Sequence, residues 1–243
     1  MTPLLVRILF IHHSVGRYLI RDGAIRERLA AIAAGGPPLL ELWDHDYNKR
    51  GLSDGSGRSL GRAFPLPDDD TDPRALLKLF TSEDPDVRSA REQVLDFDLI
   101  AMKSCYPNSA IGSDVEMARD QEVYRRLLGS LAALPRNQFL LLTSPPLVPL
   151  RSRRAEGRRA RYLAHWLSKE VELPPNVAVF DLFNRLAAPD GPHADRLRRR
   201  YRRRLPIDAH PNVRAGEEVA PDLVESFVRS AARARKRPID ARG

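Results

Sequence analysis

The chain of 243 residues has one cysteine, few lysines and no long apolar run. The single cysteine, Cys105, excludes a disulfide within the chain and fits a reducing compartment. A membrane-spanning helix needs about 20 consecutive apolar residues, and the longest apolar runs, such as Phe139–Leu142, are far shorter. Residues 4–11 are apolar apart from Arg7, but neither a basic segment nor a small-residue cleavage site flanks them. We therefore expect a soluble, cytoplasmic protein without a membrane span.

Few of the basic residues are lysine, and arginine supplies most of the positive charge. Five of the 40 basic residues are lysine. Residues 1–150 hold 18 basic and 20 acidic side chains, a net charge of −2, whereas residues 151–243 hold 22 and 12, a net charge of +10. Seven arginines lie within Arg196–Arg204 and six within Arg151–Arg161.

These clusters are interpreted either as solvated helical faces or as a surface for anions, including nucleic acid. Within them, Tyr201 is the aromatic residue that could stack on a base, which is little support for a base-stacking platform. Nucleic-acid binding through the arginine-rich C-terminal half is therefore the second hypothesis, and it belongs to a different functional class from the first one below.

Apolar segments rich in β-formers alternate with segments of helical periodicity, a pattern typical of a parallel sheet with crossover helices. The 42% of hydrophobic residues suffices for one sizeable core at this length. We predict a single α/β domain over residues 1–235, a flavodoxin-like three-layer α/β/α sandwich with about five parallel strands, and a charged tail over 236–243.

The expected strands are 5–12, 39–43, 99–103, 139–143 and 177–181, and the expected helices are 17–34, 73–80, 85–96, 114–133, 152–171 and 217–235. Residues 48–72, rich in Gly, Ser, Asp and Pro, do not fit this alternation. A loop of this length inside a compact domain is uncommon and is often functional.

The first expected strand ends in Phe10-Ile11-His12-His13-Ser14-Val15-Gly16, directly before a helix. Ser14 is therefore expected at the carboxyl edge of the sheet, where ligands of such sheets bind, and beside the positive end of a helix dipole. Its backbone N–H can face an oxyanion that develops during a reaction. An ordinary N-cap serine would give the same pattern.

A second element, Asp208-Ala209-His210-Pro211-Asn212, precedes the last expected helix. In an extended segment, residues two apart point to the same side, so Asp208 could orient the imidazole of His210. A nucleophilic serine needs a nearby base, and histidine titrates in the right range. A surface turn with a capping aspartate would explain the segment equally well.

A third polar element, Lys103-Ser104-Cys105-Tyr106-Pro107-Asn108-Ser109, follows a buried strand in the middle of the chain. The amide of Asn108 offers N–H donors for an oxyanion at the same sheet edge, and Ser109 is a nearby alternative. The alternative interpretation is an Asx-type turn that enters the next helix.

Together these elements resemble the SGNH/GDSL hydrolase family, and their order, Ser then Asn then Asp/His, covers residues 14–212. The resemblance implies a serine esterase in which Ser14 is the nucleophile and His210 its base. Asp208 would orient the base, and the oxyanion donors would be the N–H of Ser14, the amide of Asn108 and the N–H of Gly51, a glycine after the second strand.

The same resemblance implies an acyl-enzyme intermediate and no cofactor. The expected substrate is a small-molecule or carbohydrate acyl ester, and an acyltransferase could use the same site. The oligomeric state is left open. The side chains expected to contact substrate are His13, Tyr47, Tyr106 and Ser109.

The sequence also departs from the family. His12-His13 stands where the family has Gly-Asp before the serine, and Asn108 lies in Tyr-Pro-Asn-Ser instead of Gly-x-Asn-Asp. Gly55 and Gly57 compete with Gly51 for the role of donor. An inactive, anion-binding module with the same fold is therefore the alternative to an enzyme.

Two other patterns are set aside. Gly51-Leu52-Ser53-Asp54-Gly55 matches a nucleophile elbow, but that motif needs a strand before it and a helix after it, so Ser53 is interpreted as a loop serine. The six histidines lack the paired spacing of metal ligands, and we predict no metal site.

Overall fold

The computed structural model describes residues 5–34 and 39–235 and contains one six-stranded sheet in the order β3-β2-β1-β4-β5-β6. The antiparallel pair is β2 with β3, and the other neighbouring strands are parallel. The strands are β1 (Leu5–His12), β2 (Leu39–Asp46), β3 (Gly51–Ser53), β4 (Leu99–Lys103), β5 (Gln138–Leu142) and β6 (Val177–Phe180). The predicted three-layer α/β fold is confirmed, with one strand more than the five expected.

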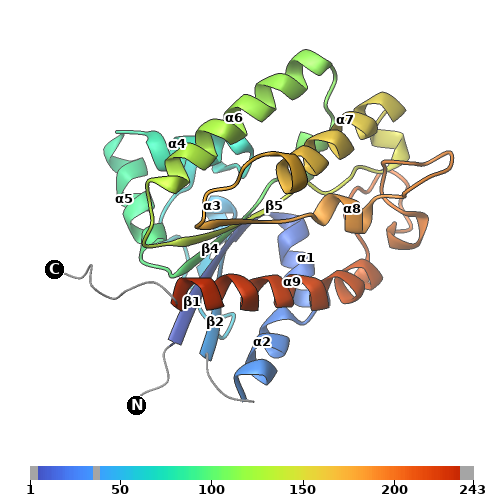
Figure 1. Ribbon diagram of the computed structural model, residues 1–243. Helices are drawn as coiled ribbons and strands as arrows, with labels where there is room; N and C mark the ends of the chain where they lie inside the picture. The colour runs from blue at the N-terminus through green and yellow to red at the C-terminus, as the bar shows by residue number, and fades with distance from the viewer. Residues whose placement is uncertain (1–4, 35–38, 236–243) are drawn as a thin grey trace.

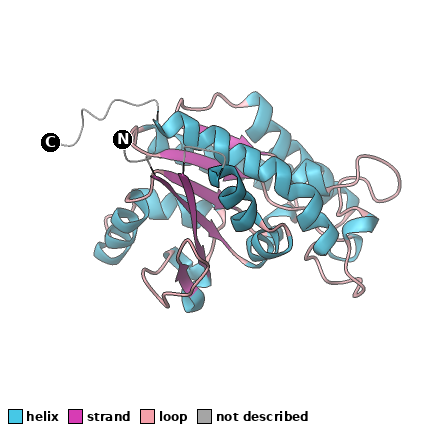
Figure 2. Ribbon diagram, turned by 90° about the horizontal axis from the view of Figure 1, so that it is seen from below, coloured by secondary structure: helices cyan, strands magenta, loops and turns pink. Residues whose placement is uncertain are grey.

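Helices cover both faces of this sheet (Figures 1 and 2). They are α1 (Ser14–Asp22), α2 (Ile25–Ala34), α3 (Tyr47–Arg50), α4 (Pro73–Thr81), α5 (Pro85–Leu95), α6 (Asp114–Ala132), α7 (Arg154–His165), α8 (Leu182–Leu186) and α9 (Val213–Arg235). Because successive strand residues point to opposite faces, Leu9 and Ile11 pack with α4, α5, α6 and α7, whereas Ile8 and Phe10 pack with α1, α2 and α9. This two-sided burial explains the near-continuous apolar run of β1.

Three expected helices have different bounds in the structure. The helix expected over 17–34 is two helices, α1 and α2, separated at Gly23 and at Ala24, which has a φ of 49°. The helix expected over 152–171 is α7 followed by a π-turn, Trp166–Glu170. The last helix begins at Val213, four residues earlier than predicted. The charged tail predicted at 236–243 lies outside the described residues.

The stretch predicted to be a loop over 48–72 has structure of its own. It starts within α3, continues as the edge strand β3 and contains a 3₁₀ turn at Pro67–Asp69. The N–H of Leu52 donates to the carbonyl of Gly61 at 3.1 Å, and the N–H of Leu60 donates back to Leu52 at 2.8 Å. The segment therefore forms a hairpin beside β2. The Gly, Ser, Asp and Pro residues of this stretch indicated a loop and did not predict the hairpin.

The strand order reverses at β1, because the chain proceeds to β2 on one side and later to β4 on the other. In sheets of this kind ligands bind at the carboxyl ends of the strands where the order reverses. Ser14 directly follows β1, and the polar segment Ser104–Ser109 directly follows β4. None of the helices in the described ranges is long and apolar enough to cross a membrane.

Candidate active site

The structure brings Ser14, His210 and Asp208 together at this point of the sheet. The Nε2 atom of His210 lies 2.9 Å from the Oγ atom of Ser14. On the other side of the ring, Nδ1 lies 2.6 Å from Oδ1 of Asp208. The same Oδ1 accepts the backbone N–H of His210 at 2.9 Å, so Asp208 both holds the ring and caps the turn that carries it. The geometry is that of a nucleophile, a base and an orienting acid.

Packing between the first and last helices places the histidine beside the serine. Helix α9 lies against α1, and two glycines allow the close approach: a Cβ added to Gly23 would lie 2.6 Å from the Cβ of Ala220, and one added to Gly216 would lie 2.8 Å from the Cβ of Asp22. The segment before α9 is held by Asn212, whose Oδ1 accepts the N–H of Ala215 at 3.2 Å. His210 is therefore positioned from a rigid helix start.

Asp208 is kept ionised by its neighbours. Burial opposes the charge, but hydrogen bonds from the backbone and ring of His210, with Arg203 beside it, hold the pKa of Asp208 below its usual range. The Nε atom of Arg203 lies 3.8 Å from Oδ2 of Asp208. A carboxylate at this position favours the ring tautomer with a proton on Nδ1, which leaves Nε2 free to accept the proton of Ser14.

The turn that carries Ser14 is fixed by His12, which is fully buried. Its Nδ1 lies 2.9 Å from the carbonyl oxygen of His13, and its Nε2 lies 3.1 Å from a carboxylate oxygen of Asp44. Asp44 in turn accepts a hydrogen bond from Arg26. His12 is thus built into the turn that carries Ser14. Because Gly16 has no Cβ, it leaves the space that the His12 side chain occupies.

His13 and Tyr47 stack face to face, with ring centroids 3.7 Å apart and ring planes 10° apart. Burial, assisted by the positive charge of Lys103, lowers the pKa of His13 to about 4, so its ring is neutral at physiological pH. Tyr47 has a φ of 36°, a left-handed conformation that is uncommon for a bulky residue. Two of the residues expected to contact substrate therefore form one stacked unit beside Ser14.

The structure does not leave Gly51 available as an oxyanion donor. Its backbone N–H donates to the carbonyl oxygen of Tyr47 and closes the single turn of α3. A Cβ at Gly51 would lie 1.9 Å from the carbonyl oxygen of Gly61, so glycine is required here by the hairpin and not by the chemistry. The prediction of Gly51 in the oxyanion hole is therefore corrected.

Asn108 and Ser109 lie on the 3₁₀ turn Tyr106–Ser109 and differ in how firmly they are held. The Oγ of Ser109 is buried and donates to the carbonyl oxygen of Pro145 at 2.8 Å. Asn108 has a looser contact, with its Nδ2 3.5 Å from the Oγ of Ser104. Of the two predicted candidates, Asn108 therefore has the freer donor.

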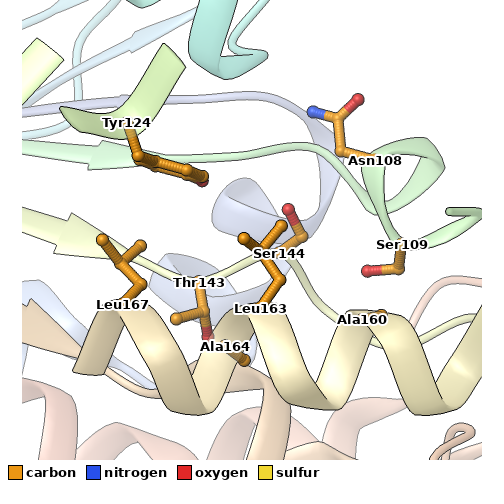
Figure 3. A pocket seen from close by; sticks show the side chains of 9 residues that line it. All are labelled: Asn108, Ser109, Tyr124, Thr143, Ser144, Ala160, Leu163, Ala164 and Leu167. Atoms are coloured by element: carbon orange, nitrogen blue, oxygen red, sulfur yellow. The ribbon is translucent and has the colours of Figure 1, made fainter. Parts of the chain in front are cut away.

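A small pocket beside this turn is lined by Asn108, Ser109, Tyr124, Thr143, Ser144, Ala160, Leu163, Ala164 and Leu167. In Figure 3 the side chains of α7 form its floor, and the amide of Asn108 points away from them. Neither Ser14 nor His210 lines this pocket. The pocket is thus a neighbour of the candidate active site, and we assign it no part in the reaction.

Two aromatic rings flank the ring of His210. Tyr106, one of the predicted substrate contacts, meets it edge-on with centroids 5.4 Å apart, and Tyr18 does the same at 5.3 Å. Tyr18 was not predicted from the sequence, although it lies four residues after Ser14 and therefore on the same face of a helix. Helical spacing from the proposed nucleophile could have identified it.

Lys103, the first residue of the polar element predicted after the middle strand, is fully buried. Lys103 ends β4, and its Nζ donates to the carbonyl oxygen of Ser104 at 2.7 Å. Burial lowers the pKa of its ammonium group, while the negative charges of Asp46 and Asp70 oppose that shift. The described ranges contain no group of three or more His, Cys, Asp and Glu side chains that could hold a metal ion.

The sequence matches no family model and no curated protein. Among solved structures, the chain is similar to a protein from Bacteroides fragilis assigned as an acylhydrolase, with a TM-score of 0.56, 11% identity and coverage of 93% of this chain and 88% of that one.

It is also similar to a lipase/acylhydrolase from Enterococcus faecalis, with a TM-score of 0.53, 13% identity and coverage of 91% and 95%. A third similar structure is a mutant acetyl esterase with an acetate ion, with a TM-score of 0.53, 11% identity and coverage of 94% and 98%. The chain shares the three-layer α/β fold of these proteins. At these identities the likeness concerns the fold, which agrees with the resemblance noted in the sequence.

Proposed function

We propose that the protein is a serine-dependent esterase that cleaves carboxylic esters through Ser14, His210 and Asp208. The observation that carries the proposal is the pair of contacts made by the His210 ring, 2.9 Å to Ser14 Oγ and 2.6 Å to Asp208 Oδ1. Only one imidazole tautomer satisfies both, with the proton on Nδ1 and a lone pair directed at the serine hydroxyl.

In the first half-reaction, Nε2 of His210 takes the proton of Ser14 as Oγ attacks the acyl carbon. The resulting imidazolium is stabilised by the carboxylate of Asp208. The imidazolium then gives its proton to the alcohol oxygen of the substrate, the ester C–O bond breaks, and the acyl group stays on Ser14 as an ester.

In the second half-reaction, His210 takes a proton from water, and the water oxygen attacks the acyl carbon. The tetrahedral intermediate collapses, Ser14 regains its proton from the imidazolium, and the acid leaves. If a sugar hydroxyl takes the place of water, the same steps transfer the acyl group, so a hydrolase and an acyltransferase differ here only in the acceptor.

The negative charge of each tetrahedral intermediate needs donors that are already in position. The N–H of Ser14 lies at the first turn of α1, where the helix dipole adds positive potential. The amide of Asn108 is the second donor in this proposal. Its Nδ2 makes only a long contact, 3.5 Å, with the Oγ of Ser104, so its N–H groups are available to an oxyanion.

For the substrate we propose a small-molecule or carbohydrate acyl ester. The support is the kind of protein that shares the fold, which includes a lipase/acylhydrolase and an acetyl esterase. A panel of aryl acetates and longer-chain aryl esters, assayed for the wild type and for Ser14→Ala, tests the proposal. Turnover that disappears in Ser14→Ala supports it, and equal turnover in both proteins contradicts it.

A second function, anion or nucleic-acid binding, concerns Arg196–Arg204. Several guanidinium groups of this cluster brace the loop around them: Arg198 donates to the carbonyl oxygen of Ala187 at 2.8 Å, and Arg202 to that of Leu197 at 2.8 Å. These contacts use the arginines within the fold and favour a structural role.

Other features of the cluster keep anion binding as a candidate. In the described part of the chain, Arg196, Arg199 and Arg202 have no ion pair with a carboxylate. Burial, with repulsion from Arg196 and Arg199, lowers the pKa of Arg202. We expect fluorescence anisotropy with labelled DNA or RNA to show weak, sequence-independent binding that added salt abolishes. Tight, sequence-selective binding at physiological salt would instead favour the binding function.

A further inference from the structure

Two segments of the chain carry positive charge without any negative charge between. Residues 147–155 hold three arginines and residues 196–207 hold seven, and neither segment has an acidic residue. Of these arginines, Arg154, Arg199 and Arg204 are exposed, and in the described part of the chain they have no ion pair with a carboxylate. Unpaired positive charge gathered in this way attracts an anionic partner.

Two hydrogen bonds hold the segments side by side. The N–H of Leu197 donates to the carbonyl oxygen of Leu147 at 2.8 Å, and the Nε of Arg151 donates to the carbonyl oxygen of Ile207 at 2.8 Å. The second segment belongs to the connection between α8 and α9 (Figure 1). The two segments therefore form one surface, which we call the arginine surface.

The arginine surface also exposes apolar side chains. Leu205, Pro206 and Ile207 are successive exposed residues, with 61% of Leu205 and 49% of Ile207 accessible to solvent. Leu150, which precedes the arginine that bonds to Ile207, is 69% exposed. Three successive exposed apolar residues are uncommon on a surface that binds nothing. Because His210 lies three residues after Ile207, these side chains border the candidate active site.

Exposed aliphatic side chains among unpaired arginines fit a lipid surface with anionic headgroups. Aliphatic side chains enter the acyl region of such a surface, and guanidinium groups contact the headgroup phosphates. Nucleic acid also offers phosphates, but its bases stack on aromatic rings. Tyr201, the aromatic residue of the two segments, is 2% exposed and cannot serve as a stacking platform. The exposed side chains therefore favour lipid over nucleic acid.

We propose that the arginine surface docks the protein on an anionic lipid surface, with Leu150, Leu205 and Ile207 inserted among the acyl chains. This docking goes beyond the proposed esterase function and does not depend on it. Together with that function, docking brings Ser14 and His210 to the lipid surface, where esters with apolar acyl chains collect.

Flotation with vesicles tests the docking. We expect the wild type to bind equimolar phosphatidylcholine and phosphatidylglycerol, and to bind phosphatidylcholine alone on the order of tenfold or more weakly. Leu205→Ser with Ile207→Ser retains every charge and should weaken binding to the mixed vesicles on the order of tenfold. Arg204→Gln should weaken it on the order of fivefold, the contribution of one arginine near an anionic surface.

The matched controls make the same changes at exposed positions outside the arginine surface. Ile32→Ser with Leu60→Ser, and Arg88→Gln, should bind the mixed vesicles as the wild type does. Leu205→Trp measures insertion directly, because its fluorescence, after subtraction of the wild-type emission, should shift to shorter wavelength on the mixed vesicles. The emission of Leu60→Trp should not shift.

Three results would overturn the docking. The first is a wild type that does not float with the mixed vesicles. The second is an unchanged affinity of the Leu205→Ser, Ile207→Ser variant together with an unshifted Leu205→Trp emission, because the attraction would then be electrostatic alone. The third is tighter binding to RNA than to the mixed vesicles, which would assign the arginines to nucleic acid.

Ser14→Ala separates this proposal from the esterase function, because it should lose ester turnover and still float as the wild type does. A wild type that hydrolyses esters in solution but does not float removes the docking alone. A wild type that floats but hydrolyses no ester removes the esterase function alone.

Discussion

The Nε2 atom of His210 lies 2.9 Å from the Oγ atom of Ser14, although 196 positions separate the two residues in the chain. The contact depends on the packing of α9 against α1, since Ser14 begins α1 and His210 lies three residues before α9. The first and last helices of the domain therefore hold the proposed nucleophile and its base together. A substitution that shifts α1 relative to α9 should therefore change the distance between His210 Nε2 and Ser14 Oγ.

Replacing members of the triad should separate their roles. We expect His210→Ala to lose activity almost as completely as Ser14→Ala, on the order of 10⁶-fold in kcat, because the base and nucleophile act as a unit. Asp208→Asn should cost less, on the order of 10⁴-fold, since an amide can hold the ring but favours the wrong tautomer. Steady-state kinetics on an aryl acetate provide the measurement.

The control for Asp208→Asn is Asp190→Asn, which makes the same change at an exposed position and should leave the rate unchanged. Asp208 also accepts the backbone N–H of His210, and asparagine can accept it too. A nearly silent Asp208→Asn together with an inactive His210→Ala would therefore contradict the triad and leave a serine–histidine dyad.

Short-range patterns in the sequence were sufficient for the fold class and for naming the segments that carry Ser14, Asp208 and His210. The alternation of strand and helix segments along the chain predicts a parallel sheet. In such a sheet the carboxyl ends of β1 and β4 lie at the same edge. The spacing of Asp208 and His210 likewise predicts that they share one side of a turn. Contacts between α1 and α9, which make these two segments meet Ser14, depend on the whole fold and were inferred only through the family resemblance.

Gly16 should be more sensitive to substitution than its position in a helix suggests. A Cβ at Gly16 would lie 2.3 Å from the Cβ of His12, whose ring holds the turn before Ser14. We expect Gly16→Ala to destabilise the protein by about 1–3 kcal/mol through overpacking and to reduce the esterase rate. Urea denaturation and kinetics on the same preparation test this expectation.

Gly129→Ala supplies the comparison, since this glycine lies within α6 and has no atom within 4 Å of an added Cβ. Alanine there should stabilise the protein by about 0.5–1 kcal/mol, as expected for a glycine removed from a helix interior. Equal effects of the two substitutions would show that the contact between residue 16 and His12 does not constrain the turn that carries Ser14.

His13 should make stability depend on pH below neutrality. The folded-state pKa of His13 is about 4, compared with an ordinary value of 6.5. As the pH falls from 6.5 to 4, the unfolded chain binds a proton that the folded protein does not, so the free energy of unfolding decreases. In His13→Phe, which retains a ring to stack on Tyr47, this decrease should be shallower.

Urea denaturation of both proteins across that pH range measures the difference. Burial also lowers the pKa of His45, so part of the slope should remain in His13→Phe. An unchanged slope would mean that His13 is protonated in the folded protein, and the account of its burial beside Lys103 would then be wrong.

Asn108→Ala tests the donor on the 3₁₀ turn after β4. Losing an oxyanion donor should lower kcat on the order of 100-fold with little change in KM. Ser109→Ala is the matched change one residue later, and its hydroxyl already donates to Pro145, so its effect should be on stability and not on kcat. A near-wild-type rate for Asn108→Ala would reject the residue as a donor.

The donors of the proposed oxyanion hole were the least predictable part of the site. A glycine after the second strand was expected to supply an N–H, and the nearest one in sequence, Gly51, donates instead to Tyr47. Tyr47, which accepts that hydrogen bond, has a left-handed backbone and a ring stacked on His13. Neither follows from residue type or spacing, because tyrosine rarely adopts that conformation.

The measurement that tests the central claim most directly is reaction of the intact protein with a fluorophosphonate, followed by mass spectrometry of its peptides. The account predicts one phosphonylated residue, Ser14, with labelling lost in Ser14→Ala and greatly slowed in His210→Ala, while both variants keep the wild-type melting temperature. Labelling at Ser53 or Cys105, or an unlabelled wild-type protein, would contradict it.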